Sequence, residues 1–293
     1  MKDYRLSEIV TAITLDGQDA TRLTMQKKLA LKSVRASYSF DSLLSLPKIE
    51  KEDVKDCINK IKKTKTPSLK DVEEEATKEL LTSGLMKKKL KLLSCDMNYY
   101  TSGIKILEYS TDREFYKREV EFLRSEMLEP GKPSLETIML FTLVREAGAI
   151  HDIFSINEQN EIQRRMSELE KDEIYAEILS INFHSCIESY ASAFIKGKRN
   201  LFKNQYLQGV AITFPFLDRR ESIFIDFVVL GTDFATRQDA AIAFLRENGF
   251  DVERYWLGDL PLLRIDNMLY RTLSSSRMCK LPIQGMVIQP YYG

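Results

Sequence analysis

The sequence contains 293 residues, of which 44% are hydrophobic and 29% are charged. Its 43 Lys and Arg residues balance 43 Asp and Glu residues, so the formal net charge is zero. This composition is typical of a soluble globular protein, and the length predicts two domains, each large enough to form its own core. Without a cationic excess, a whole-protein attraction to nucleic acid or anionic lipid is not expected. A net charge of zero does not exclude local cationic patches.

The four cysteines are too far apart to form the closely spaced pairs of a structural zinc site, and the chain has only two histidines. We therefore predict no metal and no cofactor. The N-terminus lacks the basic and apolar regions of a secretory signal, and no stretch approaches the roughly 18 apolar residues that span a bilayer. We expect a reduced, cytoplasmic protein whose thiols are core side chains.

Helical periodicity dominates the first part of the chain. Apolar residues three and four apart predict helices over 5–14, 21–34 and, within a charged run, 49–61. Ser68 is placed to cap a further helix that ends at Ser83-Gly84. Two apolar runs around a polar turn near 96–102 then predict a β-hairpin near 85–108. Further helices are expected at 111–128, 133–149, 157–170 and 172–196.

The chain becomes rich in β-branched and aromatic residues after about residue 199. The expected elements are strands at 210–216 and 223–230, a helix at 236–248, a strand at 250–256, a helix at 268–279 and a strand at 283–288. The predicted fold is a mainly α N-terminal domain with a β-hairpin, followed by a smaller α+β C-terminal domain whose mainly antiparallel sheet carries helices on one face. The predicted boundaries are 1–175, a connecting helix at 172–198, and 205–293.

Three segments carry a resemblance to a known family. They are LSEIVTAITLDG, TPSLKDVEEEATKELLTSGLMKKK, and VEFLRSEMLEPGKPSLETIMLFTLVREAGAIHDIF followed by EIQRRMSEL. Their order and spacing resemble the Golgi phosphoprotein 3 family over residues 1–175, about three fifths of the chain. This resemblance implies a mostly helical domain with a protruding hairpin.

The resemblance also implies a membrane ligand. Eukaryotic members of that family bind phosphatidylinositol 4-phosphate through basic residues on the central helix and a tryptophan near the N-terminal third. The matching helix positions here are Glu73 and Glu75, and the sole tryptophan is Trp256, in the C-terminal domain. A carboxylate repels a phosphate, so the resemblance supports the fold better than the ligand.

Lysine clusters give the chain its clearest local charge. The first hundred residues hold 20 Lys and Arg against 15 Asp and Glu, and the remainder holds 23 against 28. Dense lysines can hold anionic lipid, whereas the structural alternative is a solvated loop and a guarded strand edge. The ligand- or membrane-binding candidates are Lys62, Lys63, Lys65, Lys70, Lys87, Lys88, Lys89 and Lys91.

The same lysines fit a winged-helix arrangement in which a basic hairpin grips DNA. The helix that would enter the groove, SLKDVEEEATKELL, is acidic, so nucleic acid is the less favoured partner. We predict a non-enzymatic binding or adaptor protein whose N-terminal domain associates peripherally with anionic, phosphoinositide-type membrane. The alternative is a winged-helix-like DNA-binding regulator with a C-terminal ligand-sensing or dimerisation domain.

No residue pattern predicts catalysis. His184 and Cys186 point to different faces of one predicted helix, so they cannot act as nucleophile and base. His151 and Asp152 begin a loop, and neither the GxGxxG nor the P-loop motif occurs. We therefore predict that the protein is not an enzyme.

The aromatic C-terminal domain is the predicted protein-binding part. Phe214, Phe216, Phe224 and Phe227 provide more apolar surface than one short helix needs to cover, which favours a protein partner or a homodimer. The alternative is that these residues form the core of the domain. We interpret 218–221 as a hairpin turn and 259–267 as a polar loop that could bind a small molecule, and we favour a structural role for both.

Overall fold

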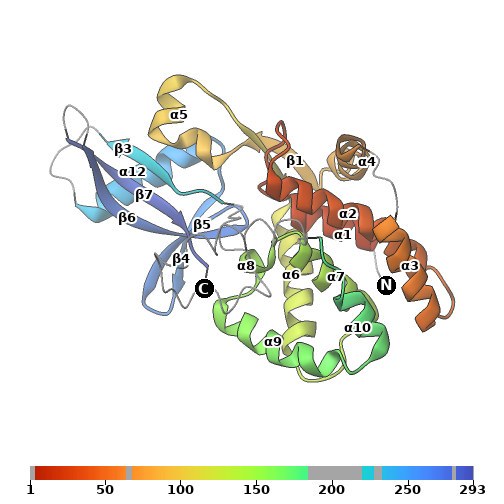
Figure 1. Cartoon of the computed structure of the whole chain (residues 1–293). Helices are drawn as coiled ribbons and strands as arrows, with labels where there is room; N and C mark the ends of the chain where they lie inside the picture. Colours follow the sequence, from red (N-terminus) through yellow and green to blue (C-terminus); the bar gives the residue numbers. More distant parts are fainter. Residues whose placement is uncertain (1–3, 64–67, 184–219, 228–232, 279–281, 293) are drawn as a thin grey trace, which may run out of the picture.

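The computed structural model describes residues 4–63, 68–183, 220–227, 233–278 and 282–292. It has a mainly helical N-terminal part with a β-hairpin and a C-terminal part built on an antiparallel sheet with a helix, which confirms the predicted fold class (Figure 1). The hairpin and the segment that joins its strands lie between the two parts (Figure 1).

Two apolar helices form the centre of the N-terminal part. α1 (Leu6–Leu15) is buried along its whole length except Glu8, and α7 (Leu135–Glu146) is buried from Thr137 onward. A helix that is apolar on all sides belongs inside a domain. The other helices of this part are α2 (Met25–Leu44), α3 (Lys51–Lys63), α4 (Leu69–Thr82), α6 (Arg113–Leu128), α8 (Ile150–Ile153), α9 (Ile156–Leu169) and α10 (Glu173–Leu179).

Local capping chemistry sets the ends of α4 as predicted. The Ser68 hydroxyl accepts a hydrogen bond from the Lys70 N–H, and Gly84 follows the helix with φ +79°. The helix predicted at 172–196 is wrong in its length, because α10 ends at Leu179 and Ser180 is its C-cap. The remainder of that prediction, from residue 184 onward, lies outside the described residues.

The predicted hairpin is present, but its connection is different. β1 (Met86–Leu90) and β2 (Leu107–Thr111) pair antiparallel. The predicted polar turn is wrong, because the strands are joined by the 3₁₀-helix η1 (Leu92–Cys95) and by α5 (Met97–Ser102). The apolar residues of η1 did not signal a longer strand. Leu92 and Cys95 are buried in the core of the C-terminal part, and Leu93 packs against it partly buried.

The C-terminal part is a sheet in the order β3-β7-β6-β5-β4, and every neighbouring pair is antiparallel. Helix α12 (Phe234–Glu247) contacts β4, β6 and β7. The strands are β3 (Ile223–Phe227), β4 (Val252–Leu257), β5 (Leu260–Ile265), β6 (Met268–Met278) and β7 (Pro282–Pro290).

Two predictions for the C-terminal part are wrong. The helix predicted at 268–279 is strand β6, because its backbone pairs with both β5 and β7. The polar loop predicted at 259–267 is mostly strand β5. Phe224 is fully buried, which favours core packing over an exposed contact for that residue. The strand predicted at 210–216, with Phe214 and Phe216, lies outside the described residues.

Polar contacts join the two parts, buried ones at Arg220 and exposed ones at Arg113. The Arg220 guanidinium, almost fully buried, donates to Asp16 Oδ2 at 2.7 Å, and Asn267 Nδ2 donates to the same carboxylate at 3.2 Å. Arg113 on α6 forms ion pairs with Glu253 at 2.6 Å and with Asp251 at 2.8 Å. The hairpin turn predicted at 218–221 lies partly outside the described residues, and Arg220 adds a side-chain contact to the N-terminal part. The Asp16 contacts hold the loop after α1 against the C-terminal part, and the Arg113 contacts hold the beginning of α6 against residues 251–253.

Candidate anion-binding site

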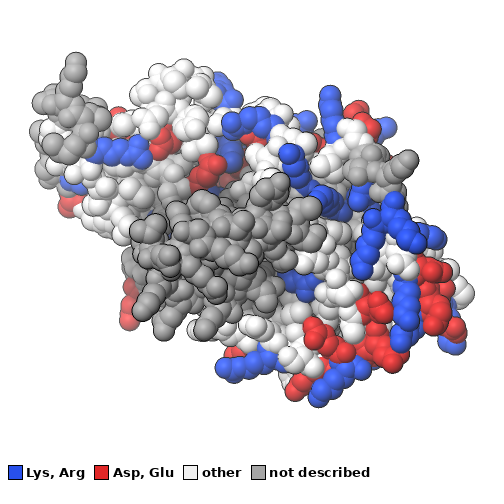
Figure 2. Space-filling model, in the orientation of Figure 1, with Lys and Arg blue, Asp and Glu red and all other residues white. Residues whose placement is uncertain are grey.

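A hollow of about 670 Å³ lies where the loop between α1 and α2, helix α4 and the hairpin β1–β2 meet. Figure 2 shows Lys and Arg side chains gathered over the region of β1, α2 and α4. The lining of the hollow includes five cationic and two acidic side chains. These are Arg22, Lys27, Lys70, Lys78 and Lys88, with Glu73 and Glu74.

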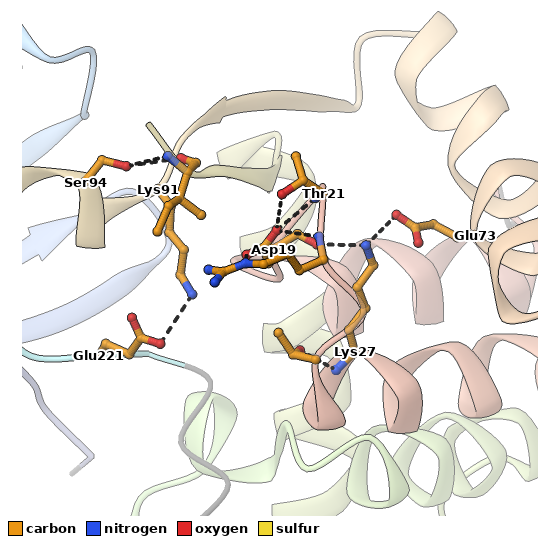
Figure 3. Close-up of polar contacts among 10 residues, drawn as sticks. Asp19, Thr21, Lys27, Glu73, Lys91, Ser94 and Glu221 are labelled. Atoms are coloured by element: carbon orange, nitrogen blue, oxygen red, sulfur yellow. Dashed lines mark hydrogen bonds and ion pairs between the residues drawn. The ribbon is translucent and has the colours of Figure 1, made fainter. Parts of the chain in front are cut away.

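Lys27, Glu73 and Tyr109 form the floor of this hollow. Lys27 Nζ lies 2.6 Å from Glu73 Oε1 and donates to the Asp19 carbonyl at 2.7 Å (Figure 3). The Tyr109 hydroxyl donates to the same Glu73 oxygen at 2.6 Å. Burial, and then the Glu73 carboxylate, raise the pKa of Tyr109, so this hydroxyl stays protonated. The ion pair offsets the desolvation of Lys27, which is 1% exposed, and it neutralises Glu73.

The loop before α2 is held by the Asp19 carboxylate. This group accepts hydrogen bonds from the backbone N–H groups of Thr21 and Arg22, each at 2.8 Å, and from Arg22 Nε at 2.8 Å. Burial opposes ionisation of Asp19, but these hydrogen bonds outweigh it and lower its pKa to about 2. Asp19 therefore stays charged and fixes the Arg22 guanidinium at the rim of the hollow.

The strand β1 divides its lysines between two sides. Lys88 pairs across the hairpin with Tyr109, and its Nζ lies 5.5 Å from the centre of the Tyr109 ring, so it faces the hollow. Successive side chains of a strand point to opposite faces. Lys89 accordingly faces the C-terminal part, where it forms an ion pair with Asp266. Lys87 is exposed.

Folding separates the eight candidate lysines into groups. Lys70 and Lys88 line the hollow, whereas Lys89 and Lys91 pair with carboxylates of the C-terminal part, Lys91 with Glu221 at 3.7 Å (Figure 3). Lys62 and Lys63 are exposed in the last turn of α3 and do not line the hollow. Lys65 lies outside the described residues.

Sequence reasoning missed Arg22, Lys27 and Lys78 as members of this cluster. Lys27 carried a signal: it stands four residues before Leu31, on the buried stripe of α2, where a lysine needs a partner within the fold. Arg22 and Lys78 carried no local signal, because each is an exposed cation in its own segment.

The two glutamates that opposed a phosphate ligand lie on different sides of α4. Glu73 faces the cationic hollow, whereas Glu75 lines a separate hollow of about 150 Å³ with Arg5, Tyr38 and Glu79. Burial and the nearby Glu75 carboxylate raise the pKa of Tyr38 to about 12. The two glutamates therefore do not form one acidic surface, and the surroundings of Glu73 are cationic.

The described cysteines are buried side chains of the core. Burial raises the pKa of the Cys57 thiol to about 11 and that of Cys95 to about 12, which opposes thiolate formation. Within the described ranges, no group of three or more His, Cys, Asp or Glu side chains could hold a metal ion. His184, Cys186 and Cys279 lie outside the described residues.

No helix in the described part of the chain is both long enough and apolar enough to cross a membrane. A scan against protein-family models, a search of the curated proteins and a search of the solved structures each find no match to this chain. The resemblance to the Golgi phosphoprotein 3 family stays a prediction from the sequence.

Proposed function

We propose that this protein is a non-enzymatic binding or adaptor protein whose N-terminal part associates with anionic, phosphoinositide-type membrane through the hollow between α2, α4 and the hairpin. The observation that carries this proposal is the convergence of Arg22, Lys70, Lys78 and Lys88 on one hollow. Lys27 pairs with Glu73, and Arg22 pairs with Asp19 at the rim. Among the other lining side chains, the three cations Lys70, Lys78 and Lys88 face one carboxylate, Glu74. A phosphate group at the rim would meet a net positive field.

Apolar side chains beside the hollow support a membrane as the source of the phosphate. Leu23 lines the hollow and is 45% exposed, and Met25, two residues further, is 48% exposed. Leu107 is also exposed, and its carbonyl accepts a hydrogen bond from Ala20 of the same loop. Cations beside exposed apolar residues are typical of surfaces that lie in the interface of an anionic bilayer. A free phosphate compound would need the cations alone.

The DNA-binding alternative has less support. In a winged helix, the connection of the hairpin reaches the DNA. Here Leu92 and Cys95 of that connection are buried in the core of the C-terminal part, and Lys89 and Lys91 are paired with carboxylates.

Vesicle flotation tests the proposed function. We compare phosphatidylcholine vesicles with vesicles that also contain phosphatidylserine or phosphatidylinositol 4-phosphate, using the wild type, Lys70→Glu/Lys88→Glu, and the matched control Lys62→Glu/Lys63→Glu. Each lysine near a charged surface contributes about 1 kcal/mol, so losing two lowers binding roughly 30-fold, and reversing their sign lowers it further.

The control should float with anionic vesicles as the wild type does, because Lys62 and Lys63 do not line the hollow. If the wild-type protein does not float with anionic vesicles at low salt, the membrane role is refuted. Binding that both double variants reduce equally would place the contact outside the hollow. Binding of inorganic phosphate by wild-type protein that does not float with any vesicle would identify a soluble anion as the ligand.

A further inference from the structure

Strand β4 forms an edge of the sheet and, within the described ranges, carries the most exposed large apolar side chain. It is hydrogen-bonded to β5 on one side only and lies at the outer side of the C-terminal part (Figure 1). Trp256 on this strand is 63% exposed. An edge strand presents N–H and C=O groups that can pair with another chain.

Proline shows which backbone groups of β4 point outward. Pro261 of β5 lies opposite Trp256, and proline has no N–H to donate. The pair Trp256–Pro261 is therefore a non-hydrogen-bonded pair, so the backbone groups of Trp256 point away from β5. The pattern alternates along the ladder, so Arg254 and Val252 also direct their N–H and C=O groups outward.

The described residues cover only part of this edge. The Val252 carbonyl accepts a hydrogen bond from Arg246 Nη2 at 2.7 Å, which closes the edge at the beginning of the strand. For Arg254 and Trp256, the described residues supply no hydrogen bond to either backbone group. The open edge thus consists of the outward groups of these two residues.

We propose that β4 pairs antiparallel with β4 of a second copy of this chain, about a two-fold axis at Tyr255. This register places Arg254 of each copy opposite Trp256 of the other and uses every open N–H and C=O group of the edge. An axis at Arg254 would require the covered Val252 edge, and an axis at Trp256 would leave Arg254 facing the turn. The two-fold register at Tyr255 therefore satisfies the backbone best.

Side-chain chemistry supports the same register. Arg254 and Trp256 are two residues apart, so they share one face of the strand. In the pair, the Arg254 guanidinium of each copy lies beside the Trp256 indole of the other, an arrangement that forms a cation–π contact. The present partner of Arg254 is Asp239, in an ion pair whose side chains are 51% and 64% exposed. Such an exposed pair contributes little, so it does not compete strongly.

Analytical ultracentrifugation of the full chain tests this dimer. We expect a reversible monomer–dimer equilibrium, and a blue shift of tryptophan emission as the concentration rises, because Trp256 is the sole tryptophan. The test variant Arg254→Pro removes an N–H that points outward, so it blocks the second copy without breaking the β4–β5 ladder. A second variant, Trp256→Thr, keeps a strand-forming residue and removes the indole.

The matched control is Leu273→Thr, which changes an apolar side chain, 46% exposed, on β6, where Leu273 pairs with Val287 of β7. Loss of the dimer in both edge variants, with the control unchanged and all circular dichroism spectra native, supports the proposal. A wild type that is monomeric at every concentration overturns it. A dimer that survives in Trp256→Thr with unchanged dissociation constant also overturns it, whether or not Arg254→Pro folds.

Discussion

Glu108 on β2 is a carboxyl with an unusual environment. It is buried between the two parts of the molecule, and burial raises its pKa from 4.5 to about 7. Arg220 and Lys89 act in the opposite direction, while Asp16 and Asp266 add to the rise. The folded state therefore holds this proton more tightly than the unfolded chain. Glu108 stabilises the fold most below about pH 4.5, and this contribution is lost as the pH rises through about 7.

The substitution Glu108→Gln removes this pH dependence, because an amide cannot ionise. We expect the unfolding free energy of the variant, relative to that of the wild type, to rise by up to about 3 kcal/mol between roughly pH 5 and pH 8. Urea unfolding at a series of pH values measures this difference. Glu247→Gln, at an exposed position on α12, should give a curve parallel to the wild type. If Glu108→Gln is also parallel, the carboxyl does not titrate in this range.

Among the elements, the turn after α1 depends on a glycine for two reasons. Gly17 has φ +73°, and a Cβ built at this position would lie 1.9 Å from Arg220 Nη1. Gly84 after α4 has a similar φ of +79°, but a Cβ there would meet nothing within 4 Å. The two positions therefore share the backbone strain of an L-residue and differ in the contact with the C-terminal part.

Comparing Gly17→Ala with Gly84→Ala isolates that contact. Gly84→Ala should cost about 1 kcal/mol of unfolding free energy from backbone strain alone. Gly17→Ala should cost about 2 kcal/mol more, because the Arg220 guanidinium must move from its ionic hydrogen bond with Asp16. Equilibrium unfolding in urea gives both values. Equal losses of unfolding free energy in the two variants would mean that Arg220 moves aside at no cost in stability.

Local signals predicted the elements whose determinants lie inside them. Ser68 and Gly84 bound α4 in the sequence as they do in the structure. Strand β6 was predicted as a helix because its strand character comes from pairing: Ser274–Ser276 pair with residues 284–286 of β7, and three serines carry no strand signal of their own. The site follows the same rule. Lys70 and Lys88 were predicted, whereas Arg22 and Lys78 join them only after folding.

For the molecule as a whole, each part has its own apolar core, and the connection of the hairpin contributes to the core of the C-terminal part. Leu92 and Cys95, which stand between β1 and α5, pack with residues of β3 to β7 and α12 rather than with the helices. Strand β1, directly before them, is paired to β2 and packs beside α4. Unfolding of the C-terminal core therefore displaces the connection of the hairpin. The hairpin in turn forms a wall of the candidate site. The two parts should unfold together.

The substitution Leu92→Ala tests this coupling, because it changes a residue of the N-terminal part that is buried in the C-terminal core. We expect a loss of roughly 2 to 4 kcal/mol, typical of a buried leucine. Hydrogen-exchange mass spectrometry in increasing urea should report the same loss for peptides of α7 and of β7, since one cooperative unit has one opening free energy. Ile156→Ala, at a 59% exposed position, should change neither peptide. A loss confined to β7 would instead identify two independently folding parts, and the hollow would then keep its shape when the sheet opens.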